Sequence, residues 1–406
     1  MPATRRHWPT GSSNRRAGTR LGSLWRPARR RSCCTSSQAP VSACCPEERV
    51  VFEDLFDAEL APMVRRMAER TREGETADGP QIRAMVWQAL VRLGATRLRL
   101  PAASGGRSAS QEDLVSAAEE LGAALCQGPL LDTLTAVELL LAPGDDRLLD
   151  EVCGGAGVAL AVRADGAASP SEPGEMVVAE GSGAGEITAE RCFVGYASEV
   201  DHLVVAGRAA GDTRVALVSR AHPSVTLRRH QELGRGELWR VRCQATPVLA
   251  WLGGADEWAG VVAGARRRQA GYLVGLSQSA LDLAVAHATR RRQFGQPIGR
   301  FQSLAFRLSE LVARTDAARL LTRAAAAQAD RGEDARLTAA QCLATAADLA
   351  RVVTAAALQV HGAVGMTDDS DAQLCYCRAV IEALWWGTPT QLRAEAAPLL
   401  RAQLSA

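Results

Sequence analysis

Lysine is absent from this chain, and all 47 of its basic residues are arginine. The absence excludes mechanisms that need a lysine Schiff base, a Walker-A lysine or a lysine general base. The chain also lacks an apolar run of the roughly 20 residues that a membrane span requires, so no membrane segment is predicted.

Zinc-type cysteine spacing is missing as well, although the chain has eleven cysteines. None forms a CxxC pair, and Cys375 and Cys377 are too close together for the usual zinc spacing. We therefore predict no metal site. Reduced thiols in a cytoplasmic protein are the expected state of these cysteines.

The charge is divided unevenly along the chain. Residues 1–49 contain ten arginines against two acidic residues, whereas the remainder has 37 basic and 43 acidic residues. The body therefore offers no basic surface of the kind that nucleic-acid binding needs. Residues 1–49 have the composition of a disordered tail, and they could also be a targeting segment or follow from a start codon assigned too early.

Apolar spacing divides the rest of the chain into three parts. Helical periods over about 52–72, 80–94, 111–126 and 129–142 predict an N-terminal helical domain at 50–154. Short alternating runs between Gly, Ser, Pro and Asp predict a small β-domain at 155–253. Helical periods then return and predict a C-terminal four-helix bundle at 254–406. The expected fold class is α+β.

The most informative stretch is RRQFGQPIGRFQ, which begins at Arg291 and lies between two helical patterns. Arg291 can hold a pyrophosphate with its planar guanidinium, and Gln293 can satisfy a polar edge. Phe294 can pack on a ring face, while Gly295 allows close approach of the backbone. This chemistry suits an extended anionic ligand.

A second motif follows at residues 359–365, which read QVHGAVG. Together the two resemble the RxQFGxPIxxFQ and QxHGGxG signatures of the acyl-CoA dehydrogenase family, with Ala363 in place of the second glycine. The resemblance is clear from about Asp256 onward and weaker back to about Glu53. It implies FAD as cofactor, with contacts from Arg291, Gln293, Phe294, Gln359, Gly362 and Thr388.

Two histidines lie near these motifs. His287 is in register with the apolar face of its helix, which favours a core or interface role. His361, within the second motif, is open to packing or to contact with the cofactor.

The resemblance also shows what is missing. In the family a segment like YEGT carries the catalytic glutamate, but here it reads LWWGT, with Trp386 at the base position. The alternative home of the base corresponds to Ala265, and neither side chain can accept a proton. Glu382 lies one helical turn before Trp386 and could replace the base only if this segment is displaced, so a solvated surface position is the expected one. No TEP…GSD-like segment is found at residues 161–170.

These departures resemble the subunit without the catalytic glutamate in heteromeric actinobacterial acyl-CoA dehydrogenases of steroid side-chain degradation. The implied protein is an oxidoreductase subunit of a tetramer, and it contributes FAD contacts to an α,β-desaturase acting on an acyl-CoA or acyl-carrier thioester. A homologous partner would supply the base. Two alternatives stay open: a homo-oligomeric biosynthetic flavoenzyme that needs no base, and a non-catalytic scaffold without flavin.

Overall fold

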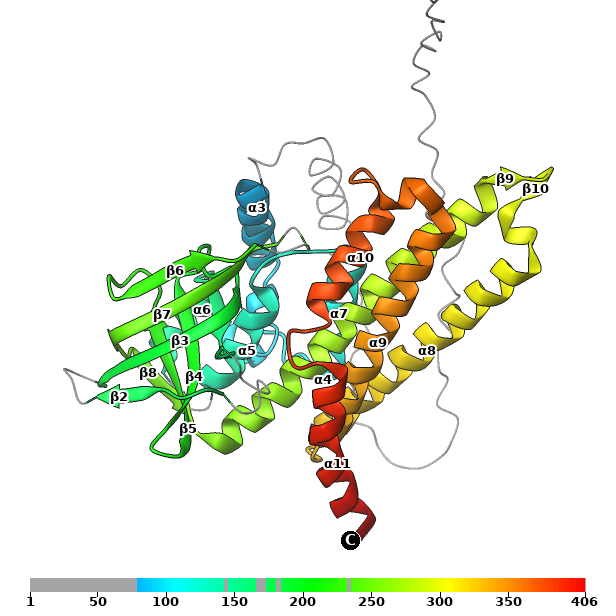
Figure 1. Cartoon of the computed structure of the whole chain (residues 1–406). Helices are drawn as coiled ribbons and strands as arrows, with labels where there is room; N and C mark the ends of the chain where they lie inside the picture. Colours follow the sequence, from blue (N-terminus) through cyan, green and yellow to red (C-terminus); the bar gives the residue numbers. More distant parts are fainter. Residues whose placement is uncertain are drawn as a thin grey trace, which may run out of the picture. The chain divides into compact units, whose positions relative to one another are not determined.

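The computed structural model describes residues 79–141, 145–165, 173–179, 184–231, 234 and 236–405. The expected tail at 1–49, the expected helix at 52–72 and residues 166–170 lie outside these ranges. Figure 1 shows the arrangement, in which helices come first, strands second and helices again last. This order confirms the predicted α+β fold class.

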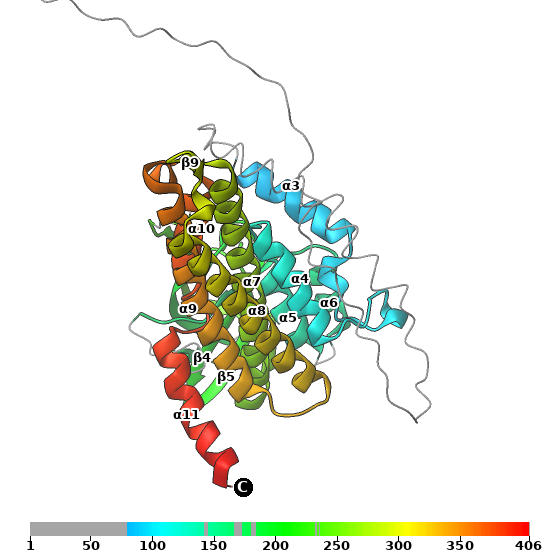
Figure 2. The ribbon, with the colours of Figure 1, turned by 90° about the vertical axis from the view of Figure 1, so that its right-hand side faces the viewer.

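The helices before the strands are α3 (Gly79–Arg92), α4 (Gln111–Ala123), α5 (Leu130–Leu141) and α6 (Asp146–Cys153), with short 3-10 turns η3 (Ala95–Arg97) and η4 (Ala102–Ser104). A capping box begins α4, because Ser110 accepts the backbone N–H of Asp113 while the Asp113 carboxylate accepts the N–H of Ser110. The apolar faces of α4 and α5 are buried against α7, and Figure 2 shows them along that helix.

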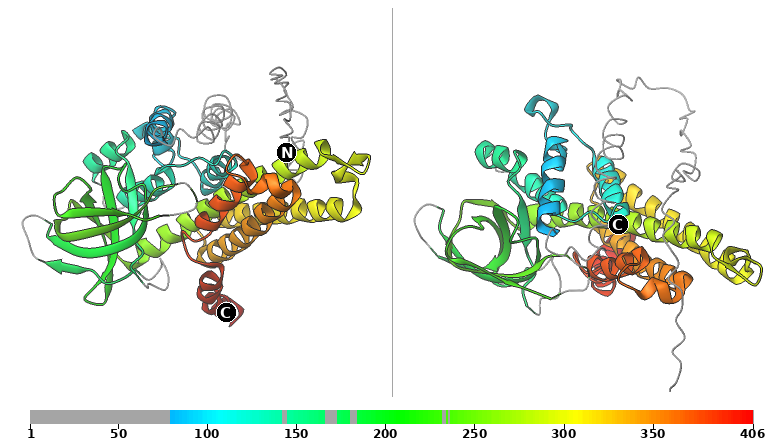
Figure 3. Two further views of the ribbon diagram at one scale, coloured as in Figure 1. Left: turned by 45° about the horizontal axis from the view of Figure 1, so that its top comes forward. Right: turned by 90° about the horizontal axis from the view of Figure 1, so that it is seen from above.

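The β-domain consists of two four-stranded sheets (Figure 3). One has the order β1-β4-β5-β8 and the other β2-β3-β7-β6. Their strands are β1 (Val158–Ala161), β2 (Val177–Ala179), β3 (Glu186–Gly195), β4 (His202–Ala209), β5 (Asp212–Ser219), β6 (Val225–Arg229), β7 (Leu238–Pro247) and β8 (Ala250–Gly253). Alternate residues of the inner faces form one apolar core that includes Ile187, Val205 and Val241.

The last part of the chain is helical except for one hairpin. Its elements are α7 (Ala255–Arg290), β9 (Arg292–Gln293), β10 (Gln296–Pro297), η5 (Ile298–Arg300), α8 (Gln302–Asp330), α9 (Arg336–His361), η6 (Gly362–Met366), α10 (Asp371–Glu382) and α11 (Pro389–Ser405). Helix α9 packs against α7, α8, α10 and α11 and forms the centre of the bundle.

The apolar character of α9 corrects one reading of the sequence. The segment Arg336–Met366 is long and apolar enough, with a mean hydropathy of 1.3 in its best window, to cross a membrane by length and composition alone. Its many alanines raise the hydropathy without forming a run of large apolar residues. Because α9 is the central helix of the bundle, its contacts explain this composition without a membrane.

Three consecutive arginines are buried in the middle of α7. Arg268 is fully buried and donates to Oε2 of Glu138 at 2.9 Å and to the hydroxyl of Thr135 at 2.8 Å. Arg266 donates to Oε2 of Glu395 at 2.7 Å. Arg267 donates to Oε1 of Gln111 at 3.1 Å. Each guanidinium is thus hydrogen-bonded to a group far away in the sequence, as burial of a charge requires.

Candidate functional site

The first signature folds into a tight hairpin between α7 and α8. Strands β9 and β10 pair antiparallel, with Gln293 opposite Gln296, and the two residues between them are Phe294 and Gly295. Both have positive φ, 51° and 79° respectively, as a type I′ turn requires. A phenylalanine in this conformation is strained, so the hairpin holds its ring outward at a cost. The Phe294 side chain is 92% exposed.

The predicted contact residues of this hairpin all face solvent. Arg291 ends α7, where its backbone N–H donates to the carbonyl of His287 at 2.8 Å, and its side chain is exposed. The exposed side-chain amide of Gln293 donates to the neighbouring carbonyl of Arg292 at 2.7 Å. The hairpin therefore presents the guanidinium of Arg291, the amide of Gln293 and the ring of Phe294 together. The guanidinium and the amide can bind the negative charge of a pyrophosphate.

The second signature ends α9. Gly362 has a φ of 65° and is the C-cap of the helix, with its N–H directed to the carbonyls of Leu358 and Gln359. Gln359 is exposed on the last turn. The rings of His287 on α7 and His361 on α9 lie 4.4 Å apart between centroids. This contact brings the ends of α7 and α9 side by side, so the two signatures share one end of the bundle (Figure 1).

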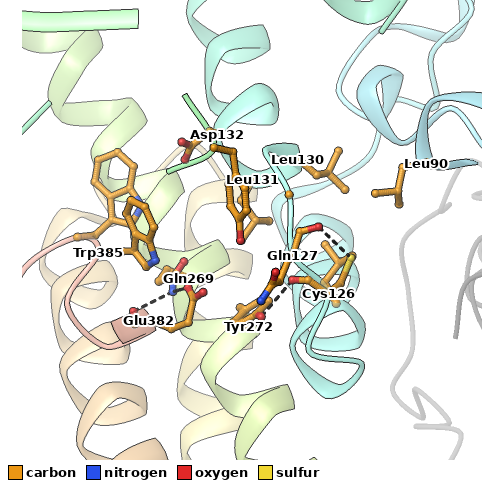
Figure 4. Close-up of a pocket in the computed structure, with 14 residues that line it drawn as sticks. Leu90, Cys126, Gln127, Leu130, Leu131, Asp132, Gln269, Tyr272, Glu382 and Trp385 are labelled. Atoms are coloured by element: carbon orange, nitrogen blue, oxygen red, sulfur yellow. Dashed lines mark hydrogen bonds between the residues drawn. The ribbon is translucent and has the colours of Figure 1, made fainter. Parts of the chain in front are cut away.

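A cavity of about 60 Å³ lies elsewhere, between α4, α5, α7 and the segment after α10 (Figure 4). Sites for small organic ligands are usually roughly 300–1,000 Å³. The cavity therefore has room for a few water molecules and none for an acyl chain. Its polar lining comes from Cys126, Gln127, Asp132, Tyr196, Gln269, Tyr272 and Glu382, and its apolar lining includes Trp385 and Trp386.

Glu382 lines this cavity, which corrects its expected position as a solvated surface residue. Its side chain is 12% exposed, and its Oε2 accepts a hydrogen bond from the amide of Gln269 at 3.0 Å. Arg378, itself buried, lies 3.8 Å from Oε1 of Glu382. Gln269 lies one helical turn after Ala265. Its contact with Glu382 was not predicted from the sequence, although its spacing from Ala265 was a signal that could have identified it.

Trp386 and Ala265, the two positions at which the resemblance places a catalytic base, are both buried. Trp386 is 7% exposed and its ring lies 6.4 Å from that of Trp258, measured between centroids. Ala265 is 3% exposed in the same apolar core. The indole of Trp385 packs on Gly195 at the end of β3 so closely that a Cβ there would lie 2.6 Å from the ring. The indole rings of Trp385 and Trp386 fill the space around the position where the resemblance places the base.

Thr388 serves a local structural purpose. Its hydroxyl accepts the N–H of Gln391 at 3.3 Å, and its own N–H donates to the Gln391 side chain at 2.9 Å. This reciprocal pair caps the start of α11.

Burial dominates the acid–base behaviour of the cavity. It raises the pKa of Asp132 to about 7, even though the carboxylate accepts the backbone N–H of Leu160 at 3.1 Å. Burial likewise raises the pKa of the Cys126 thiol to about 12 and that of Tyr272 well above its ordinary value. The Tyr272 hydroxyl donates to the Cys126 carbonyl at 3.1 Å. The thiol and phenol thus stay neutral, and they fix the cavity wall without supplying a base.

Among the described residues no group of three or more His, Cys, Asp or Glu side chains could hold a metal ion. The described cysteines form no disulfide with one another. The site therefore has two separate parts: an exposed cationic and aromatic end, and a small cavity with a mixed polar and apolar lining.

Known proteins resemble this chain in sequence and in fold. Residues 254–397 match the acyl-CoA dehydrogenase C-terminal domain model. The chain is 40% identical over 116 residues to a probable acyl-CoA dehydrogenase, fadE25 of Mycobacterium leprae, which is 28% of this chain and 30% of that relative's length. It is 29% identical over 297 residues to the acyl-CoA dehydrogenase IpdE2 of Mycobacterium tuberculosis, covering 72% of this chain and 80% of the relative.

A solved steroid ACAD, Tcur3481-Tcur3483, has a similar fold, with a TM-score of 0.78 at 20% identity over 88% of this chain and 100% of that one. Helical domain, small β-domain and helical bundle with two signature turns define the class of acyl-CoA dehydrogenase-like proteins. Residues 254–397 are thus an acyl-CoA dehydrogenase C-terminal domain, and the chain as a whole shares the fold of the solved steroid ACAD.

Proposed function

We propose that this chain is an acyl-CoA dehydrogenase-like subunit that contributes FAD contacts to an α,β-desaturase whose base lies on a homologous partner. The observation that favours this function is the contrast between the two parts of its site. The hairpin residues Arg291, Gln293 and Phe294 are turned outward, whereas the region of the base is filled by Trp385 and Trp386.

The outward hairpin supports a role toward a second subunit. A 92% exposed phenylalanine at positive φ is costly in an isolated chain, and it is expected where another molecule covers it. The solved steroid ACAD with a similar fold is named for two proteins, which supports a heteromer here. By the same resemblance we propose a cytoplasmic tetramer acting on an acyl-CoA or acyl-carrier thioester.

Bound flavin would supply the hydride acceptor of such a desaturation. The chain's own residues would act around it. Arg291 and Gln293 would bind the pyrophosphate, and Gln359 with Gly362 would close on the same nucleotide. Trp385 and Trp386 narrow this chain's own cavity, which has no room for a thioester. Proton removal is therefore assigned to the partner's glutamate.

The lone chain should show no thioester desaturation, because neither Trp386 nor Ala265 can accept a proton. The test is to purify the chain alone and after co-expression with a glutamate-bearing homologue encoded beside it. Flavin absorbance and dye reduction with acyl-CoA substrates are then measured on both. Flavin and activity only in the co-expressed sample support the proposal. An active, flavin-loaded lone chain contradicts it, and flavin in neither sample indicates a scaffold.

Replacing Arg291 with Ala should weaken FAD retention in the assembled protein. A charge-assisted hydrogen bond contributes about 1.5–3 kcal/mol, which is roughly ten- to a hundred-fold in affinity. Flavin content and the dissociation constant are measured beside Arg307→Ala, an exposed arginine of α8 paired with Glu310, as the control. Unchanged affinity in the Arg291 variant would mean that this residue is only a solvated helix end.

A further inference from the structure

Two histidines join the ends of the helices that carry the two signatures. His287 lies in the last turn of α7 and His361 is the last residue of α9. Their rings are 4.4 Å apart between centroids and inclined by 38°, and both side chains are partly exposed. Since Arg291 follows His287 by one turn and Gly362 follows His361 directly, the pair sits between the predicted nucleotide contacts.

The hydrogen bonds leave ring nitrogens available. Nδ1 of His361 lies 2.7 Å from the carbonyl oxygen of Ala357. A carbonyl can only accept, so this nitrogen carries the hydrogen and Nε2 has the lone pair. Within the part of the chain that the structure describes, His287 has no hydrogen bond from its ring, only the contact with His361. Each ring can therefore bind a proton and present it to a ligand.

The charges around the pair are positive. The groups that act on His287 are His361 from α9 and Arg291 and Arg290 from its own helix end, and no described carboxylate is among them. Burial, followed by these three groups, lowers the pKa of the His287 imidazole. The partial negative charge of two neighbouring helix C-termini favours protonation, but it does not overcome the other effects. The histidine pair therefore lies in a positively charged environment, and no described carboxylate acts on His287.

We propose that His287 and His361 form an anion clamp, which binds the same flavin pyrophosphate as Arg291 and takes up a proton when it binds. This inference rests on the proposed function. A pyrophosphate beside the pair would cancel the repulsion from Arg290 and Arg291 and accept N–H···O bonds from both rings. It would thereby stabilise the imidazolium form.

The sign of the pH dependence follows from that linkage. An anion bound beside the pair would raise the lowered pKa of the His287 imidazole, so affinity rises as pH falls through the range in which histidine titrates, about 6–7. One linked proton strengthens binding by at most about ten-fold for each unit of pH. Well above this range no proton is taken up on binding, and the charged contact of Arg291 and the uncharged contacts remain.

The experiment is calorimetric titration of FAD into the flavin-free assembled protein, in buffers of different ionisation enthalpy and from pH 5.5 to 8.5. ADP, which has the pyrophosphate without the flavin ring, is the second probe. Wild type is expected to take up protons near pH 7 with both ligands. His287→Gln and His361→Gln should each reduce the uptake and flatten the pH profile, while affinity at pH 8.5 stays within about two-fold of wild type.

His222→Gln is the matched control, since His222 is hydrogen-bonded to Ser224 in the β-domain, and it should titrate as wild type does. A wild-type pH profile in both His287→Gln and His361→Gln overturns the clamp and leaves the proposed function intact, provided that FAD still binds and Arg291→Ala weakens it. No binding of FAD by any assembly at any pH overturns the clamp and the proposed function together.

Discussion

We expect Arg268→Leu to lower the free energy of unfolding by about 3 kcal/mol, because removing one partner of a buried ion pair leaves the other charge without compensation. Arg268 is fully buried on α7 and donates to Glu138 at 2.9 Å. Arg99 lies 3.5 Å from the other carboxylate oxygen and softens the loss, which places the expected value at the low end of the usual range. Denaturant unfolding at pH 7 measures it.

A double variant separates the ion pair from the packing. Arg268→Leu combined with Glu138→Leu removes both charges, and it should regain most of the lost stability. Arg307→Leu is the surface control, because its partner Glu310 is about half exposed, and the expected loss is below about 0.5 kcal/mol. If the double variant is as unstable as the single one, lost packing of the guanidinium and not an orphaned carboxylate explains the effect.

The pH dependence gives an independent check. Burial alone would raise the pKa of Glu138, but Arg268, Gln111 and Arg99 lower it below its ordinary value. A depressed pKa stabilises the folded state above the unfolded pKa of about 4.3, and that stabilisation is lost as pH falls through the lower folded value. Without Arg268 this effect weakens or reverses. The difference between wild type and Arg268→Leu should therefore shrink on acidification.

Much of the fold could be predicted because it rests on local patterns. Leu273, Leu276 and Ala280 keep a helical period, and all three are buried on α7. The apolar runs around Val158 and His202 are strands. Strands β3 (Glu186–Gly195) and β6 (Val225–Arg229) give a weaker signal in the sequence, because charged residues interrupt their apolar ones.

The site was harder to predict, since its partners are far apart in the sequence. The amide of Gln269 bonds to Glu382, 113 residues later, and this contact moves the carboxylate from the expected surface into the cavity wall. Arg268 and Glu138 are 130 residues apart, and a run of arginines in a helix gives no sign that it is buried. Motif spacing predicts roles for Arg291 and Gln359, but the contact between His287 and His361, which brings their helix ends together, depends on helix packing.

We expect Gly275→Ala to destabilise the protein by about 3 kcal/mol, at the upper end of what overpacking causes. Helices α4 and α7 touch backbone to backbone at this point, and a Cβ on Gly275 would lie 1.8 Å from the carbonyl oxygen of Glu119. A backbone atom cannot turn aside as a side chain can, so the two helices must separate. Thermal and denaturant unfolding of the variant measure the loss.

Gly260→Ala is the control on the same helix, because a Cβ there meets no atom within 4 Å. That change should leave stability equal or raise it by about 0.5–1 kcal/mol, since alanine favours a helix.

Gly122 makes the same kind of approach from α4, with its Cβ position 1.9 Å from the carbonyl of Tyr272. The contact therefore also fixes Tyr272 against Cys126 in the cavity wall. Gly275→Ala should loosen the cavity as well as the fold, seen as faster hydrogen exchange at residues 119–127 than in Gly260→Ala. Equal exchange and equal stability in the two variants would show that α4 and α7 do not pack this closely.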